Sequence, residues 1–124
     1  MVHGTGLRTI EIPKSVYWLG NGLVADCQSM ERVTIPENIG RIPDHMFEGC
    51  TNLKKVELHE KLGTIGERAF FGCSSLDFII IPDSVKLIGQ DAFTNTDKQF
   101  IIQCSFGSYA EEYARKNKFK YQLV

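Results

Sequence analysis

Residues 65–82, which read IGERAFFGCSSLDFIIIP, indicate the fold of this chain most clearly. Related stretches start 23 residues earlier, as IPDHMFEGCTNLKKVELH at residues 42–59, and 23 residues later, as IGQDAFTNT at residues 88–96. Cys27, Cys50 and Cys73 are separated by the same interval. A constant period in the range of about 20–50 residues indicates a structural repeat, so the chain is expected to stack several copies of one unit.

Seven columns of apolar residues, each made of positions one period apart, stay in register over four copies of the unit. The columns are Leu7, Met30, Leu53 and Leu76; Ile10, Val33, Val56 and Ile79; Ile12, Ile35, Leu58 and Ile81; Val16, Ile39, Leu62 and Val85; Leu19, Ile42, Ile65 and Ile88; Leu23, Met46, Ala69 and Ala92; and Val24, Phe47, Phe70 and Phe93. We therefore expect a single domain over residues 1–124, with repeats at 7–29, 30–52, 53–75 and 76–98 and a C-terminal cap at 99–124.

Each unit opens with a segment in which inward apolar residues alternate with outward ones, the pattern of a β-strand. The four segments are Thr9–Ile12, Arg32–Ile35, Lys55–Leu58 and Phe78–Ile81. Gly20, Gly66 and Gly89, with Pro43 in the same place of the second unit, predict a turn. The run Glu67–Gly72 predicts one helical or 3₁₀ turn that ends at glycine.

One such unit cannot bury its own apolar face, whereas stacked copies can. Strands that recur in the same direction pair in parallel, and parallel crossovers are nearly always right-handed. The predicted fold class is α/β: a right-handed solenoid of 23-residue repeats with a parallel sheet on one face and a helical C-terminal cap.

The cap is predicted from residues 108–124. Ser108 and Glu111 have the spacing of a capping box at the start of a helix, and Phe119–Val124 alternates like a final strand. Ala110, Tyr113 and Ala114 share one helix face, with Glu111 and the other charged residues elsewhere around it. Since nothing equivalent precedes Leu7, either the chain is part of a longer protein or another copy covers that end.

The segment Leu53–Leu58, LKKVEL, matches the strand signature of leucine-rich repeats. The stretches at residues 42–59 and 65–82 together resemble the BspA-like (Treponema pallidum type) leucine-rich repeats, over about residues 7–104. The first unit departs from the family pattern, because Leu23 and Val24 stand where Ala-Phe is usual. The resemblance implies a bacterial or protist protein, at the cell surface or secreted, that mediates adhesion to proteins of host or neighbouring cells.

The composition excludes several classes of function. With 14 Lys+Arg against 15 Asp+Glu, the net charge of −1 predicts no binding to nucleic acid or to anionic membranes. No apolar run approaches the roughly 20 residues of a membrane span, so membrane insertion is not expected. Residues 1–6 lack the features of a signal peptide; either the chain begins downstream of one, or the protein stays inside the cell.

The residues that could support catalysis or metal binding have structural explanations. A repeat aligns the cysteines in a row, not in the tetrahedron that zinc needs, so we expect reduced cysteines in the core. His3, His45 and His59 occupy unrelated columns, and His59 replaces a proline. Glu11 and Glu57 lie two strands apart, roughly 10 Å, beyond the spacing of a retaining glycosidase pair. We predict no enzymatic activity, no metal site and no cofactor.

The outward-facing strand positions are the more informative surface. One outward column contains Thr9, Arg32, Lys55, Phe78 and Ile101, and the other contains Glu11, Thr34, Glu57, Ile80 and Gln103. The exposed face therefore changes from charged to apolar along the stack, and adjacent large apolar groups on such a face often mark a contact. The candidate protein-binding residues are Arg32, Thr34, Lys55, Glu57, Phe78, Ile80, Ile101 and Gln103. Alternatively, the chain's own tail, through Phe119 or Tyr121, or a neighbouring domain covers the apolar part.

The leading functional prediction is a non-catalytic module that binds a protein or peptide on this face, with the partner's identity undetermined. The alternative is a structural spacer, or the end of a longer repeat array, that self-associates through its uncapped N-terminal end. Trp18, Leu19 and Leu23 would form the contact between copies in that case.

Overall fold

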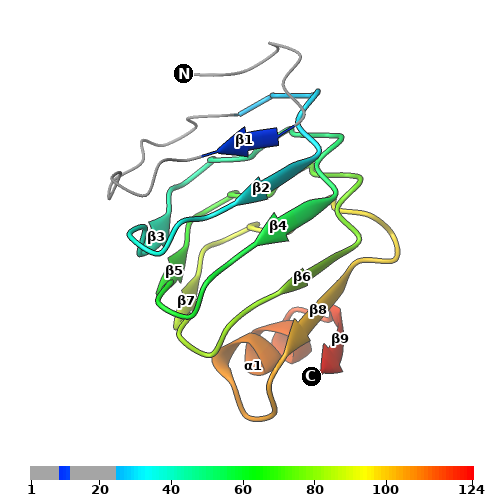
Figure 1. Cartoon of the computed structure of the whole chain (residues 1–124). Helices are drawn as coiled ribbons and strands as arrows, with labels where there is room; N and C mark the ends of the chain where they lie inside the picture. Colours follow the sequence, from blue (N-terminus) through cyan, green and yellow to red (C-terminus); the bar gives the residue numbers. More distant parts are fainter. Residues whose placement is uncertain (1–8, 12–24) are drawn as a thin grey trace.

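The computed structural model describes residues 9–11 and 25–124 of the chain. The backbone winds in stacked turns, with short strands on two faces and the C-terminal helix at one end (Figure 1). The elements in chain order are β1 Thr9–Glu11, β2 Arg32–Thr34, β3 Arg41–Ile42, β4 Lys55–Glu57, β5 Thr64–Ile65, β6 Phe78–Ile80, β7 Leu87–Ile88, β8 Ile101–Cys104, α1 Tyr109–Lys116 and β9 Lys120–Leu123.

The strands form three parallel sheets, ordered β1-β2-β4, β6-β8-β9 and β3-β5-β7. Paired residues in the repeats lie one period apart, as in Arg32 beside Lys55 and Phe78 beside Ile101. The predicted leucine-rich-repeat solenoid with 23-residue spacing is thus confirmed. The sheets β1-β2-β4 and β6-β8-β9 lie along the same side of the coil, and β3-β5-β7 forms another side (Figure 1).

On the side formed by β1-β2-β4 and β6-β8-β9, hydrogen-bonded pairing is interrupted between β4 and β6. The period is kept across the interruption, so no inserted residue causes it. The other sides of the same two turns remain joined, because the backbone amides of Phe70, Gly72 and Gly89 donate to Ala92, Thr94 and Ile65 at 2.8, 2.9 and 2.8 Å. Strand pairing is therefore missing between these two turns only on the side that carries β4 and β6.

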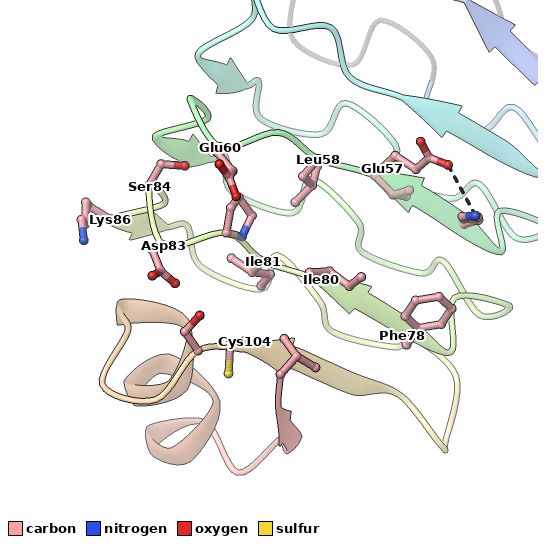
Figure 2. Close-up of a pocket in the computed structure, with 15 residues that line it drawn as sticks. Glu57, Leu58, Glu60, Phe78, Ile80, Ile81, Asp83, Ser84, Lys86 and Cys104 are labelled. Carbon is pink, nitrogen blue, oxygen red and sulfur yellow. Dashed lines mark ion pairs between the residues drawn. The ribbon is translucent and has the colours of Figure 1, made fainter.

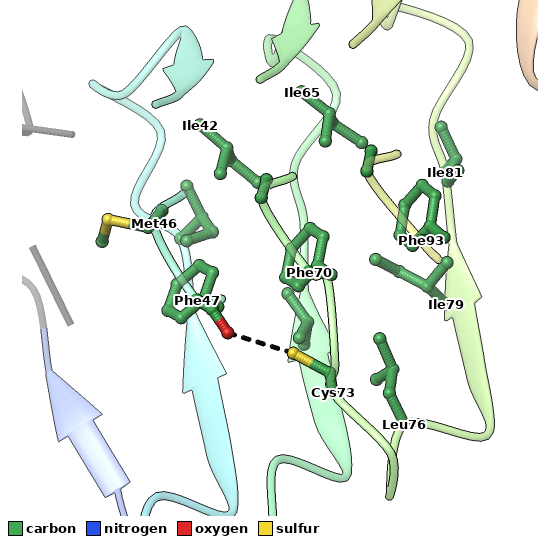
Figure 3. Packing of buried hydrophobic residues seen from close by; sticks show 14 of the residues in the cluster. Ile42, Met46, Phe47, Ile65, Phe70, Cys73, Leu76, Ile79, Ile81 and Phe93 are labelled. Atoms are coloured by element: carbon green, nitrogen blue, oxygen red, sulfur yellow. Dashed lines mark hydrogen bonds between the residues drawn. The ribbon is translucent and has the colours of Figure 1, made fainter. Parts of the chain in front are cut away.

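The core is built from the predicted columns. Every member within residues 25–124 is buried except Leu58, which is half-buried. A stack of phenylalanine rings runs along the centre (Figure 3): Phe47 to Phe70 at 5.2 Å between ring centroids, and Phe70 to Phe93 at 5.4 Å. Phe100 continues the stack at 5.3 Å from Phe93, and Phe119 packs edge-on against both. Because the same side-chain shape recurs at the same place in successive turns, each ring packs against its neighbours.

The four cysteines are buried in the core, in agreement with the sequence prediction, and none is joined in a disulfide. The Cys73 thiol donates to the backbone oxygen of Phe47 at 3.1 Å (Figure 3). Burial raises the pKa of Cys50 to about 12 and raises that of Cys73 further. These thiols act as small core residues and stay protonated at neutral pH.

The predicted helical turn at Glu67–Gly72 is instead a succession of tight turns. Ala69 donates to Gly66 and Phe71 donates to Arg68, each three residues back. Arg68 and Gly72 both have positive φ, 55° and 76°, which interrupts a right-handed helical path. The expected glycine at the end of the run is thus correct, and the helical geometry is wrong.

The C-terminal cap has the predicted helix and final strand. The Ser108 hydroxyl accepts the Glu111 amide at 3.2 Å at the helix start, and β9 pairs with β8. Ala110 and Ala114 lie on the buried face of the helix. Glu111, off the face shared by Ala110 and Ala114, is also buried; its carboxylate accepts the Gly107 amide at 2.7 Å and lies 3.5 Å from the Arg115 guanidinium. Among the described residues no helix is long and apolar enough to cross a membrane.

Candidate binding groove on the exposed sheet face

The eight predicted binding residues all lie on β2, β4, β6 and β8, on the same side of the coil. The four residues of β2 and β4, which are Arg32, Thr34, Lys55 and Glu57, are exposed. On β6 and β8, Ile80 is 51% exposed, while Phe78, Ile101 and Gln103 are half-buried. Their assignment to the outward face is therefore consistent with the structure, and their role in binding remains a prediction.

A groove with a volume of 870 Å³ opens between β4 and β6 (Figure 2). It brings together four of the predicted residues, Lys55, Glu57, Phe78 and Ile80. Its other lining residues are Val56, Leu58, Glu60, Ile81, Pro82, Asp83, Ser84, Lys86, Cys104, Ser105 and Val124. The remaining four predicted residues, Arg32, Thr34, Ile101 and Gln103, do not line it.

The groove follows from the interruption between the two sheets. Hydrogen bonds hold paired strands about 4.8 Å apart. On either side of the groove this pairing continues past the strand ends, with the Ile35 amide donating to Glu57 and the Ile81 amide to Gln103, both at 2.9 Å. The hydrogen bonds recorded over residues 25–124 include none between β4 and β6. The face is hollowed here, and the inward residues Val56 and Ile81 contribute to the lining.

One end of the groove is bordered by an ion pair on β4. Lys55 Nζ lies 3.4 Å from Glu57 Oε1, and the Thr34 hydroxyl donates to Glu57 Oε2 at 3.5 Å. Both charged side chains are more than half exposed, so the pair contributes only about 0–1 kcal/mol to folding. The two charges compensate one another and leave this end close to neutral.

The other end is formed by the loops that follow β4 and β6. Glu60, Asp83, Ser84 and Lys86 gather there, at the opposite end from Phe78 (Figure 2). The pKa of the nearby Cys104 is raised, first by burial and further by the charges of Glu111 and Asp83. Sequence reasoning missed these loop residues because it followed only the alternation within strands. Their position in the loops that follow β4 and β6, Glu60 and Asp83 each three residues after a strand ends, is the signal that could have found them.

Neither Phe119 nor Tyr121 covers the apolar face, and of the tail only Val124 lines the groove. β9 extends the sheet at the far edge of β8, with Tyr121 beside Ile102 and Gln122 beside Gln103. Phe119 packs into the ring stack, 5.8 Å from Phe100. The proposed intramolecular cover by Phe119 or Tyr121 is therefore wrong, and Ile80 stays half exposed.

The histidines in the described part of the chain make structural contacts. His59 Nε2 lies 2.7 Å from the backbone oxygen of Ile39, and its Nδ1 accepts the Lys61 amide at 3.1 Å. His45 Nδ1 lies 2.5 Å from Glu48 Oε1, whose other oxygen pairs with Arg68 at 2.9 Å. Over residues 9–11 and 25–124, no group of three or more His, Cys, Asp or Glu side chains is placed to hold a metal ion.

Several predictions for the N-terminal end concern residues outside the described part of the chain. They include the role of His3, the turn at Gly20, the missing cover before Leu7 and the self-association contact through Trp18, Leu19 and Leu23. On the outward strand columns, Thr9 and Glu11 pair with Arg32 and Thr34 by backbone register.

Comparison with known proteins identifies the repeat. The sequence pattern of the BspA type leucine rich repeat region (6 copies) matches residues 3–118. A search of curated proteins finds no match.

Solved structures of bacterial leucine-rich repeat proteins have the same fold. A leucine rich cell surface protein from Faecalibacterium prausnitzii is 36% identical, with a TM-score of 0.59, over 64% of this chain and 21% of that protein. A leucine-rich repeat protein from Bacteroides capillosus is 26% identical, with a TM-score of 0.67, over 79% of this chain and 78% of that one. The leucine rich repeat protein of T. pallidum, 24% identical over 79% of this chain and 59% of that one, has a TM-score of 0.60 and supports the fold alone.

The chain thus spans about a fifth of the length of the F. prausnitzii protein. Leucine-rich repeat proteins are generally protein-interaction modules and typically not enzymes. With the repeat pattern matched over nearly its whole length and the stacked parallel turns in place, this chain belongs to the BspA type leucine-rich repeat family.

Proposed function

We propose that the chain is a non-catalytic module that binds a protein partner in the groove between β4 and β6. The observation that carries this proposal is the half-exposed Ile80 in a groove whose floor reaches the core. An apolar side chain that docks against Ile80 removes apolar surface of both partners from water, as the central residues of protein interfaces do. The charged residues at the ends of the groove would orient the partner.

The cell surface is the location that fits this function. The F. prausnitzii relative is a cell surface protein, and the family resemblance implies adhesion to proteins of other cells. We extend both features to this chain as part of the proposal. Its partner would then be an exposed protein of a host cell or of a neighbouring cell.

Photo-crosslinking from the groove tests this function. Phe78, which lines the groove, is replaced by a photo-crosslinking phenylalanine analogue of similar shape. The matched control carries the same analogue at Leu87, which is 56% exposed on the β3-β5-β7 side. Both chains are incubated with surface proteins of host cells and, separately, with lysate of the source organism, and crosslinked proteins are identified by mass spectrometry.

The expected result is a partner that crosslinks from position 78 and not from position 87. The purified partner should then bind the unmodified chain in a calorimetric titration, and Ile80→Asp should weaken binding about tenfold or more. Leu87→Asp, with a similar change in surface polarity, should leave it unchanged. Equal crosslinking from both positions, or full binding by Ile80→Asp, would contradict a site in this groove.

A further inference from the structure

The two ends of the groove differ in charge. Lys55 and Glu57 pair with each other at one end. At the other end Glu60 and Asp83 are exposed carboxylates, and neither makes an ion pair among the described residues. Lys86 is the cation on that side, so two carboxylates face one ammonium group. A ligand with a positive charge at this end is therefore favoured.

The middle of the groove is apolar and open to solvent. Ile80 is half exposed, with half-buried Phe78 and Leu58 on its two sides (Figure 2). Pockets for small molecules enclose about 70–90% of the ligand surface, which walls made of strand side chains on an open face do not provide. A segment of polypeptide that lies along the groove covers these side chains better than a compact small molecule.

The length of the groove sets the length of that segment. Phe78 and Asp83 are five residues apart, and an extended chain rises about 3.3 Å per residue, so they are at most about 16 Å apart. An extended peptide of about five or six residues spans the same distance and points every second side chain to one face. Because β4 and β6 remain neighbours, such a peptide lies over the groove and does not enter the sheet as a strand (Figure 1).

We propose that the groove binds an extended peptide segment of the partner that presents two apolar side chains to Phe78, Leu58 and Ile80, followed by a lysine or arginine between Glu60 and Asp83. This assignment rests on the proposed function and adds the chemical class of the ligand. The apolar side chains supply the burial, and the cation sets the direction in which the peptide lies.

Selection from a random peptide library tests the ligand class without knowledge of the partner. A phage-displayed library of random dodecapeptides is selected on the unmodified chain and on Glu60→Lys/Asp83→Lys. The unmodified chain is expected to enrich peptides with two apolar residues two positions apart and a lysine or arginine nearby. The double variant is expected to enrich aspartate or glutamate at the basic position instead.

An enriched peptide, made synthetically and labelled, then gives affinities by fluorescence anisotropy. Glu60→Gln/Asp83→Asn should weaken its binding about three- to tenfold, since exposed ion pairs each contribute modestly, and added salt should reduce the difference. Glu67→Gln/Asp91→Asn, which removes two exposed carboxylates outside the groove lining, is the matched control and should have no effect. Thermal melting checks that every variant is folded.

The outcomes separate the two proposals. Peptides that require Ile80 but show no preference for a basic residue, and are insensitive to Glu60 and Asp83, overturn the ligand class and leave the groove as the binding site. No enrichment on the unmodified chain, or binding that survives Ile80→Asp, overturns both. A concentration-dependent mass in light scattering that is abolished by Ile80→Asp shows that a second copy fills the groove, and it too overturns the ligand class.

Discussion

The rings of Phe70 and Phe93 lie 5.4 Å apart between centroids and within 5° of parallel, one period apart in the sequence. Phe47 occupies the opposite side of Phe70 at 5.2 Å, so Phe70 is enclosed by identical side chains from the turns before and after it. Cohesion between neighbouring turns therefore depends strongly on this central ring.

Phe70→Ala is expected to destabilise the chain by about 3–5 kcal/mol, because it leaves a cavity between two rings that cannot close up. Phe70→Leu, which keeps most of the volume, should cost clearly less. Urea unfolding followed by circular dichroism gives both values. A loss below about 1 kcal/mol for the alanine variant would contradict the close packing of the stack.

Gly89→Ala should destabilise the chain because the turns approach too closely for a side chain there. A Cβ at Gly89 would lie 2.4 Å from the backbone nitrogen of Glu67. We expect a cost of about 1–3 kcal/mol from the forced backbone shift. Gly40→Ala is the control, because a Cβ at Gly40 meets nothing within 4 Å. Equal stability of the two variants in chemical unfolding would refute the close approach.

The ion pair of Glu48 with Arg68 predicts a pH dependence of stability. The hydrogen bond from Arg68, followed by a smaller contribution from His45, holds the pKa of Glu48 below its ordinary value of 4.5 in the folded chain. A lowered folded-state pKa adds stability that is present above pH 4.5 and is lost as the pH falls through the folded value. Glu48→Gln should therefore be less stable at pH 7, with a difference that shrinks in acid.

Melting temperatures measured from pH 7 down to about pH 3 test this sign. Glu67→Gln serves as the control, since the exposed Glu67 carboxyl makes no ion pair among the described residues. A Glu48→Gln difference that grows as the pH falls would mean that the carboxylate is unfavourable in the folded chain.

The buried cysteines should be unreactive in the folded protein. Because burial raises the pKa of Cys50 to about 12 and the thiolate is the reactive form, iodoacetamide at pH 8 should leave Cys50 and Cys73 unmodified. Both should react fully in denaturant. Mass spectrometry of peptides from the two samples reads the result, and modification of either residue in the folded chain would contradict its place in the core.

The core could be predicted residue by residue because the period alone determines it. A position that is apolar in four successive units must face the same interior in each, whatever the details of the turn. The prediction placed Phe47, Phe70 and Phe93 in one column, which the structure shows as a stack of rings, and it identified the capping role of Ser108. The path of the backbone between the strands was harder to predict, because Arg68 adopts a positive φ that its residue type does not suggest.

The candidate site could be predicted only in part. Alternation within strands identified Lys55, Glu57, Phe78 and Ile80, all of which line the groove. It could not predict the groove itself. The 23-residue spacing from β4 to β6 is the same as between the other repeats, and the apolar columns continue through the interruption. Glu60 and Asp83 were missed because loop positions carry no alternation. Glu111 is buried with a hydrogen bond from Gly107 and an ion pair with Arg115, and the helical periodicity alone does not predict its burial.

From the one-sided interruption we expect a hinge, because strand pairing joins the two turns on one side only. β5 and β7 stay paired, and Phe70 and Phe93 stay stacked, across the level at which β4 and β6 are not joined. Small rotations about this continuous side would widen or narrow the groove without breaking a hydrogen bond between the two turns. We therefore expect the groove to adjust its width to ligand side chains of different size, with little change in the core beneath it.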